Sequence, residues 1–386
     1  MKIALLKENK NEYRVCLIPA DVKVLVANKH EIIITKNAGQ EAGFTDREYL
    51  EAGAKIANNN SEAIGNSNII LKLSKPTGRE FKTISPNQIL VSLFNLANNP
   101  KVLEKLLKFQ QITLGLEAIQ ENGIFTLMIP NEQIKGKFGA LLGAYNLSKL
   151  AKFGLGKIFA SIEHNKNKAQ FTIINASYAG LEAAKAILGL GGNLTVLEND
   201  EHLAKQIKDD HYLHTLAKLN NVKFEVIKAD YTDLSKIVTT TDVLINTNSL
   251  PGSLTAKRIT QKMVSTMKPG SVIIDLAIDQ GVAGDTEKKP TTFQKPYYIV
   301  EGVKHFAIEN IPALFANSVS VAISNILTEK FLKNLKGENV LSILKEHPNL
   351  MNAIMTYEGH LTNRIVADAL HLEYKDIHTL LKIKAL

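Results

Sequence analysis

The sequence has few residues of the kinds that build covalent cross-links or thiolate metal sites. Among its 386 residues there is a single cysteine, Cys16, and there is no tryptophan. One cysteine excludes an intramolecular disulfide and a zinc site built from several thiolates, so we expect no metal site. The chain also opens without the apolar core and cleavage pattern of a signal peptide. We therefore expect a protein of a reducing compartment, the cytoplasm.

Long apolar runs and basic stripes are missing as well. No stretch reaches the roughly 18 consecutive apolar residues of a membrane-spanning helix, so we expect no membrane span. The formal net charge is +8, but the lysines are scattered, often beside acids, and no basic run is interleaved with aromatics. Such diffuse charge does not indicate a nucleic-acid partner. With 45% hydrophobic and 22% charged residues, the composition is that of a soluble globular protein.

What the sequence does have is a regular alternation of short apolar runs and helical patterns. Apolar runs separated by helix-like spacing favour a parallel sheet with helices on both faces, which is an α/β fold. In the first 130 residues the runs are 3–6, 31–35, 69–73, 89–93 and 112–116, and helical patterns occupy 20–27 and 46–52.

The same alternation returns after a helical pattern at 131–153, which we interpret as a crossover into a second domain. Pro312 then opens a helical segment, 313–335, that leads back to the first domain, where the residues up to 386 add helices. We therefore predict two doubly wound, Rossmann-like parallel-sheet domains, made of residues 1–130 plus 312–386 and of residues 131–311. Strands of the second domain are expected at 171–174, 194–197, 223–227, 243–246, 272–276 and 298–300.

The first turn of the second domain resembles a dinucleotide-binding turn without two of its three glycines. The Gly-x-Gly-x-x-Gly fingerprint falls on Asn175, Ser177 and Gly180. Asparagine is a good substitute where φ is positive, whereas Ser177 adds a side chain where a phosphate would lie. Glu198 ends the next strand, where a carboxylate binds ribose hydroxyls and repels a 2′-phosphate, which favours NAD(H) over NADP(H). An α/β turn that binds nothing remains an alternative.

Blocks from both predicted domains occur in the order known from one family. "KENKNEYRVCLIPADV" opens the chain and "YEGHLTNRIVADAL" lies near its end. Read together, the blocks resemble the alanine dehydrogenase and pyridine nucleotide transhydrogenase family nearly end to end, and the last block resembles soluble alanine dehydrogenases. The blocks span residues 7–22, 37–56, 268–281, 289–293, 309–314 and 357–370.

The resemblance implies an oxidoreductase that moves a hydride between an amino acid carbon and NAD(H), and a homo-oligomer. It places the arginine that holds the substrate carboxylate at Arg14 and the aspartate that handles protons at Asp279. Taken without the resemblance, Arg14 would be an ion-pair residue of a loop and Asp279 a helix N-cap or turn residue. Besides the turn residues and Glu198, the resemblance implies cofactor contacts from Ala179, Leu250, Ile278 and Asn310.

Two family positions are altered. The lysine that faces the substrate is replaced by Ser74, although Lys72 and Lys75 flank it, and the histidine that shuttles protons is replaced by Asn95. Asparagine donates and accepts hydrogen bonds but does not shuttle protons, and loss of a general acid or base typically costs about 10²–10⁴ in rate. Lys72 or Lys75 would have to contact the substrate, a small amino or keto acid, in place of the lost lysine.

Three functions remain open from the sequence. The first is an NAD-dependent amino acid dehydrogenase or imine reductase with an altered substrate. The second is a catalytically inactive relative that acts as a binding or regulatory protein. The third is an NAD(H)-binding subunit of the transhydrogenase type, which Asp279 and the last block fit poorly. Retention of NAD(H) binding separates the first from the second. Gly180 and Glu198 favour it, whereas Asn175 and Ser177 count against it and indicate weaker binding.

Overall fold

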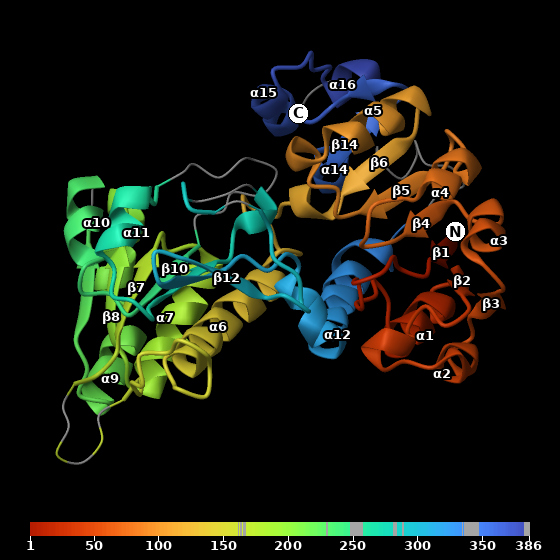
Figure 1. The fold of residues 1–386 in the computed structure, drawn as a ribbon. Coiled ribbons are helices and arrows are strands. Elements are labelled where there is room, and N and C mark those ends of the chain that lie inside the picture. The colour runs from red at the N-terminus through yellow and green to blue at the C-terminus, as the bar shows by residue number, and fades with distance from the viewer. Residues whose placement is uncertain are drawn as a thin grey trace. The chain divides into compact units, whose positions relative to one another are not determined.

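The chain forms two compact units in a computed structural model. The structure describes residues 1–160, 162, 164, 167–228, 231–247, 258–280, 284–287, 289–333, 335 and 347–381. The first unit comprises Met1–Asn131 and the described residues from Pro312 onward, and the second comprises the described residues from Glu132 to Ile311. Each unit is built around its own sheet (Figure 1).

The first unit has a mostly parallel sheet with the strand order β15-β14-β6-β5-β4-β1-β2-β3. The strands from β6 to β3 pair in parallel, whereas β14 is antiparallel to both β6 and β15. Their bounds are β1 Lys2–Leu5, β2 Glu31–Thr35, β3 Lys55–Ala57, β4 Ile69–Leu71, β5 Ile89–Ser92, β6 Ile112–Gly115, β14 Ile354–Tyr357 and β15 His360–Leu361.

Helices cover both faces of this sheet because its central strands are apolar on both sides. β4, β5 and β6 are buried throughout, as expected of parallel strands between helical layers. One face packs in a single core cluster with α3, α4, α5 and α15; an apolar cavity on the other face is bounded by α12 and the π-helical turn that continues it. The helices are α1 Pro19–Ala27, α2 Asp46–Glu51, α3 Asn60–Gly65, α4 Gly78–Thr83, α5 Pro100–Lys108, α12 Ala316–Leu327, the π turn Thr328–Leu332, α14 Pro348–Met351, α15 Arg364–Leu370 and α16 Ile377–Leu380.

The second unit repeats the design with the strand order β12-β13-β11-β10-β7-β8-β9. All pairs are parallel except that of β12 with β13. The strands are β7 Gln170–Ile174, β8 Asn193–Leu197, β9 Phe224–Ile227, β10 Val243–Asn246, β11 Val272–Asp275, β12 Tyr297–Val300 and β13 Val303–Phe306. The helices are α6 Ile129–Asn146, which begins just before the unit boundary, α7 Tyr178–Leu190, α8 Glu201–Lys208, α9 His211–Leu219, α10 Tyr231–Ile237 and α11 Gln261–Thr266.

Glycines let α6 lie unusually close to its neighbours. A Cβ at Gly136 would lie 2.1 Å from the carbonyl oxygen of Ala179, in the first turn of α7. A Cβ at Gly143 would lie 2.6 Å from the side chain of Val243 in β10. Neither position has room for another residue, so α6 forms a tight backing for α7 and for the sheet.

The predicted α/β fold with two mostly parallel sheets is confirmed, and the differences lie at the ends of elements. The segment after residue 350 was expected to add only helices, but β14 and β15 form a hairpin there. Glu358 and Gly359 both have positive φ, 46° and 81°, which is the backbone of the two-residue turn that suits a hairpin. The helix expected at 131–153 ends at Asn146, and the one expected at 313–335 starts as a 3₁₀ turn before α12.

One helical stretch among the described residues, Ile311–Leu332, is long and apolar enough to cross a membrane by length and composition alone. Of its most apolar window, 56% is buried inside the protein. Core helices of soluble proteins pass the same test, so this stretch carries no argument for a membrane span.

Candidate active site

The residues predicted to bind substrate gather at one edge of the first sheet. Arg14 follows β1, Ser74 follows β4 and Asn95 follows β5, and these strands are neighbours in the order β5-β4-β1. The chain therefore brings these side chains to the carboxyl ends of adjacent parallel strands, where α/β sheets place their ligands.

Arg14 is buried and already paired. Its Nε and one terminal nitrogen donate to the two carboxylate oxygens of Glu12 at 2.8 and 2.7 Å, and the other nitrogen donates to Asn131 Oδ1 at 2.6 Å. Burial disfavours the charge, but Glu12 outweighs that effect and the pKa of Arg14 is raised. The guanidinium is thus a permanent cation with a fixed orientation.

Lys72 forms a buried ion pair with Glu80. Its ammonium is fully buried and contacts Asn9 Oδ1 at 2.9 Å and both carboxylate oxygens of Glu80 at 2.8 and 2.7 Å. Three N–H donors thus have three acceptors, and a substrate contact would require this pair to open. Lys75 is half-buried, and its charge opposes the rise in the pKa of Glu117 that burial causes, so it lies near the strand edge.

Ser74 hydrogen-bonds a carboxylate that follows β1. Its amide and its hydroxyl donate to Glu8 Oε2 at 2.8 and 2.5 Å, and the amide of Leu73 donates to Glu8 Oε1 at 2.6 Å. Burial first, and then the neighbouring charge of Glu12, raise the pKa of Glu8 to about 7. The hydrogen bonds oppose that shift.

Asn95 sits in a tight turn supported by a second carboxylate. Its φ and ψ are 45° and 52°, a left-handed conformation that asparagine tolerates. The amides of Phe94 and Asn95 donate to Glu117 Oε1 at 3.0 and 2.8 Å. Burial raises the pKa of Glu117 to about 7, although these hydrogen bonds and Lys75 oppose the rise.

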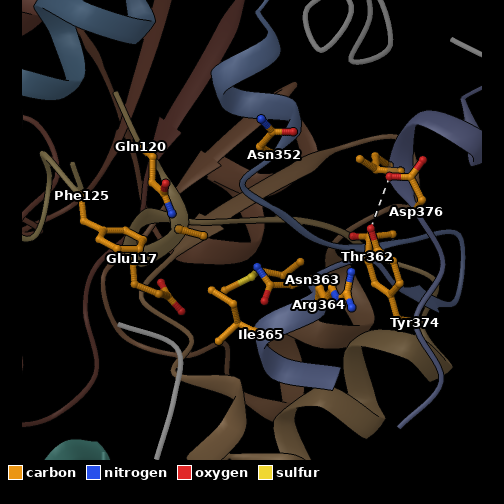
Figure 2. Close-up of a pocket in the computed structure, with 13 residues that line it drawn as sticks. Glu117, Gln120, Phe125, Asn352, Thr362, Asn363, Arg364, Ile365, Tyr374 and Asp376 are labelled. Carbon is orange, nitrogen blue, oxygen red and sulfur yellow. Dashed lines mark hydrogen bonds between the residues drawn. The ribbon is translucent and has the colours of Figure 1, made fainter. Parts of the chain in front are cut away.

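A cavity of about 210 Å³ in the first unit lies beside Glu117. Figure 2 shows Glu117 and Phe125 on one side and Asn363 facing them from the segment that begins α15. Several polar side chains that line the cavity form hydrogen bonds with residues close to them in sequence. Asn363 accepts from Val366 N at 3.1 Å and caps α15, and Asp376 accepts from the Tyr374 hydroxyl at 3.3 Å. None of the predicted substrate residues lines this cavity.

In the second unit, the turn after β7 has the backbone of a dinucleotide turn. Asn175 takes a positive φ of 67°. Ser177 is the N-cap of α7, and its hydroxyl accepts from Gly180 N at 3.4 Å. A Cβ at Gly180 would lie 2.6 Å from the carbonyl oxygen of Asn175, so the third glycine is needed for close packing. Ala179 is buried in the same first turn.

Glu198 ties the end of β8 to this turn. Its carboxylate accepts from Ala176 N at 2.7 Å and from Asp200 N at 2.9 Å. Thr247, which follows β10, donates its hydroxyl to the carbonyl of Asn175 at 2.6 Å. The turn is therefore fixed by side chains from both neighbouring strands.

Asp279 lies in a 3₁₀ turn, Ile278–Gln280, just after β11. Its Oδ2 accepts from Lys135 of α6 at 3.3 Å, and Lys135 also donates to Glu132 at 2.9 Å. Burial disfavours the Lys135 charge, but the two carboxylates outweigh it and raise its pKa.

Two further residues predicted to contact the cofactor also belong to the second unit. Ile278 is buried in the same turn as Asp279, and Asn310 adopts a positive φ of 58° before the next 3₁₀ turn. Leu250 lies outside the described residues.

Sequence reasoning missed four residues that support these edges: Glu8, Glu117, Lys135 and Thr247. Glu117 directly follows the apolar run 112–116, and Thr247 directly follows 243–246, so the rule for strand ends would have found both. Lys135 pairs with a residue 144 positions away, which no local pattern indicates. Among the described residues no group of three His, Cys, Asp or Glu side chains is arranged to hold a metal ion.

The chain is similar to curated alanine dehydrogenases along its whole length. It is 32% identical to the alanine dehydrogenase of Staphylococcus saprophyticus over 386 residues, which covers 99% of this chain and 100% of that protein. It is 31% identical to alanine dehydrogenase 2 of Staphylococcus aureus over 385 residues, with the same coverage.

Solved structures and family models agree with these relatives. An L-alanine dehydrogenase structure matches with a TM-score of 0.84 and 26% identity, over 96% of this chain and 99% of that one. A transhydrogenase from Sinorhizobium meliloti matches in fold, with a TM-score of 0.73 and 18% identity over 94% and 99% of the two chains. The family models "Alanine dehydrogenase/PNT, N-terminal domain" and "C-terminal domain" match residues 4–130 and 140–364. The chain therefore belongs to the alanine dehydrogenase/PNT family.

Proposed function

We propose that this protein is an NAD-dependent dehydrogenase that interconverts a small amino acid and its imino or keto acid. The observation that carries the proposal is the turn after β7, which keeps its backbone although two glycines are absent. Asn175 takes the left-handed conformation of the first glycine, and Gly180 keeps the close approach of the third. Both features keep the start of α7 close to the end of β7, as in dinucleotide-binding turns.

The residues present fit NAD(H). The pyrophosphate would lie against the start of α7, where backbone amides favour an anion. The residues that would contact it there are Asn175, Ser177, Ala179 and Gly180. Glu198 would accept hydrogen bonds from the adenosine ribose, since each of its oxygens has a second lone pair. Ile278 and Asn310 would lie along the rest of the cofactor. When bound, NAD⁺ accepts the hydride from the substrate α-carbon.

On the substrate side, Arg14 would hold the carboxylate and Asp279 would assist proton transfer. Ser74 and Asn95 replace a cation and an imidazole, so the pocket contains less positive charge than a pocket with both family residues. We therefore propose that the substrate differs from alanine in the group that faces Ser74 and Asn95. Lys75, whose charge reaches Glu117, would be the lysine nearest to that group.

A second candidate, a catalytically inactive NAD(H)-binding or regulatory protein, is favoured by the pairing of the cations. Glu12 holds Arg14 and Glu80 holds Lys72, both inside the protein. This arrangement suits a stable fold as well as an active site. Absence of NAD(H) binding would favour this second candidate, and where NAD(H) binds, turnover separates the two.

The first experiment is an NADH titration followed by the fluorescence of NADH itself. We expect saturable binding in the micromolar range, with NADPH at least about tenfold weaker, a difference of roughly 1.4 kcal/mol. Glu198→Gln is expected to reduce the preference for NADH. Glu201→Gln is the matched control, because Glu201 lies close by in sequence and its side chain is 78% exposed. No binding at millimolar NADH would overturn the proposal.

A protein that binds NADH would then be screened for NADH formation with NAD⁺ and single amino acids. Oxidation of any of them supports the dehydrogenase, whereas binding without turnover of any amino or keto acid supports the inactive candidate. We further propose a homo-oligomer in the cytoplasm, by analogy with the family, and light scattering on the purified protein tests the oligomer.

A further inference from the structure

We propose that Glu8 is the proton-transfer group of the substrate edge and replaces the histidine that Asn95 has displaced. This inference rests on the proposed dehydrogenase function and names the residue that would make it work. Asn95 itself does not exchange protons in the required range, and among the described residues no histidine lies between His30 and His164.

Glu8 occupies the right place. Its carboxylate accepts from the amide and hydroxyl of Ser74, the residue at the position where the family has its substrate-facing lysine. The same hydroxyl accepts from Asn9 N at 3.1 Å, so its proton points to Glu8. A substrate group lying against Ser74 would therefore lie beside the Glu8 carboxylate as well.

The charges around Glu8 favour proton exchange near neutral pH. Burial and the charge of Glu12 raise the pKa of Glu8 to about 7, against three hydrogen bonds that lower it. The charged and titratable groups that face it are Glu12, Arg14 and the buried thiol of Cys16, all in the segment after β1. The neighbouring cation after β4, Lys72, is neutralised by Glu80.

The replacements at positions 74 and 95 are linked through Glu8. A lysine at position 74 would put an ammonium beside Glu8 and hold it ionised, so Glu8 would not exchange protons at neutral pH. Ser74 removes that ammonium. Serine in place of lysine at position 74 removes a cation that would contact the substrate. The same change allows Glu8 to act as an acid and a base.

Glu117 has a similarly raised pKa but a different role. Its side chain is almost completely buried, and its oxygens are held by the amides of Phe94 and Asn95. It shapes the turn that carries Asn95 and is a positioning residue. Glu8 is only partly buried and lies at the Ser74 hydroxyl.

The proton steps that follow hydride transfer balance with Glu8 as their acid and base. After a hydride has left the α-carbon for NAD⁺, water attacks the iminium carbon and gives one proton to the Glu8 carboxylate. This forms the C–O bond of a neutral carbinolamine and leaves Glu8 protonated. Glu8 returns the proton to the nitrogen, the C–N bond breaks with its electron pair leaving on ammonia, and the hydroxyl proton passes to Glu8 as the carbonyl forms. Glu8 then loses that proton to ammonia or solvent.

The first test is a pH titration of the glutamate side-chain carboxyl carbons by carbon-13 NMR. We expect a resonance with a midpoint near pH 7 that is missing in Glu8→Gln and present in Glu51→Gln, an exposed control. Ser74→Lys tests the same point without removing Glu8 and should move that midpoint below about pH 5. A Glu8 midpoint below pH 5 in the unaltered protein would overturn the proposal.

The second test is turnover of the amino acid that the unaltered protein oxidises. Glu8→Gln should lower kcat by about 10²-fold, leave the NADH dissociation constant unchanged and be partly rescued by Glu8→Asp. Unchanged kcat in Glu8→Gln would overturn this inference and leave the proposed function standing. Absence of turnover in the unaltered protein would overturn both, so the two failures are distinguishable.

Discussion

At the residue scale, the site is characterised by carboxylates that are held by backbone amides. Glu8 follows β1 and Glu117 follows β6 in the first unit. Both carboxylates accept from backbone amides, and both have pKa values raised to about 7. Arg14 and Lys72, the buried cations nearby, are paired with Glu12 and Glu80. Neutral pH therefore lies in the range where the charge of this edge changes.

The free energy of unfolding should depend on pH through the titration of Glu117. A carboxyl whose pKa is higher in the folded than in the unfolded protein adds stability below the unfolded value, about 4.5, and loses it as the pH rises to about 7. A shift of this size corresponds to roughly 3 kcal/mol. The free energy of unfolding relative to Glu117→Gln should thus fall between about pH 4.5 and pH 7 in denaturant titrations. A difference independent of pH would contradict the raised pKa.

How far these residues could be predicted depends on where their partners lie. Arg14, Ser74 and Asn95 follow apolar runs that are evident in the sequence, but it is the family resemblance that singles them out. Lys135 could not be recognised, because its partner Asp279 is far away in sequence and α6 looks like an ordinary crossover helix. The pairing of Arg14 with Asn131 also spans a long stretch of sequence, 117 positions.

At the element scale, close helix packing supports the cofactor edge. α6 touches the first turn of α7 through Gly136, and that turn begins at the N-cap Ser177. A displacement of α7 would move the amides proposed to face the pyrophosphate. The geometry of the turn thus depends on α6 as well as on the residues in the fingerprint.

Gly136→Ala should therefore destabilise the protein, although alanine is normally the better helix former. The new methyl group would meet the backbone of Ala179 at 2.1 Å, and such overpacking costs typically about 1–3 kcal/mol. Gly189→Ala, in the same α7, meets no atom within 4 Å and should stabilise by about 0.5–1 kcal/mol. Urea unfolding measures both, and NADH affinity should fall only in Gly136→Ala. Equal effects of the two changes would refute the packing argument.

The elements themselves followed from apolar runs wherever strands are buried on both faces. β2, β5, β6 and β10 fall within one or two residues of the expected ranges. β3 and β15 are two or three residues long and lie at the edges of the sheet, where short strands have little burial pattern. The hairpin of β14 and β15 depends on its turn conformation, and "EG" is a weaker turn signal than "NG" or "DG".

At the scale of the whole molecule, each unit uses its sheet in the same way. Side chains after β1, β4, β5 and β6 form the proposed substrate edge, and side chains after β7, β8, β10 and β11 form the proposed cofactor edge. In each unit these strands are consecutive in the sheet. Each core thus carries its own set of proposed ligand groups, and the turn proposed to hold NAD(H) belongs to the second unit.

Calorimetry with and without NADH tests this division. A ligand that binds only the folded protein stabilises it by about 2.7 kcal/mol when its free concentration is 100 times its dissociation constant. If the units unfold in separate transitions, NADH should raise the midpoint of one of them and leave the other in place. Gly189→Ala, which lies in α7, identifies the transition of the second unit independently, because it should raise the same midpoint. NADH acting on the other transition would place the cofactor on the first unit and contradict the assignment of the turn at Asn175.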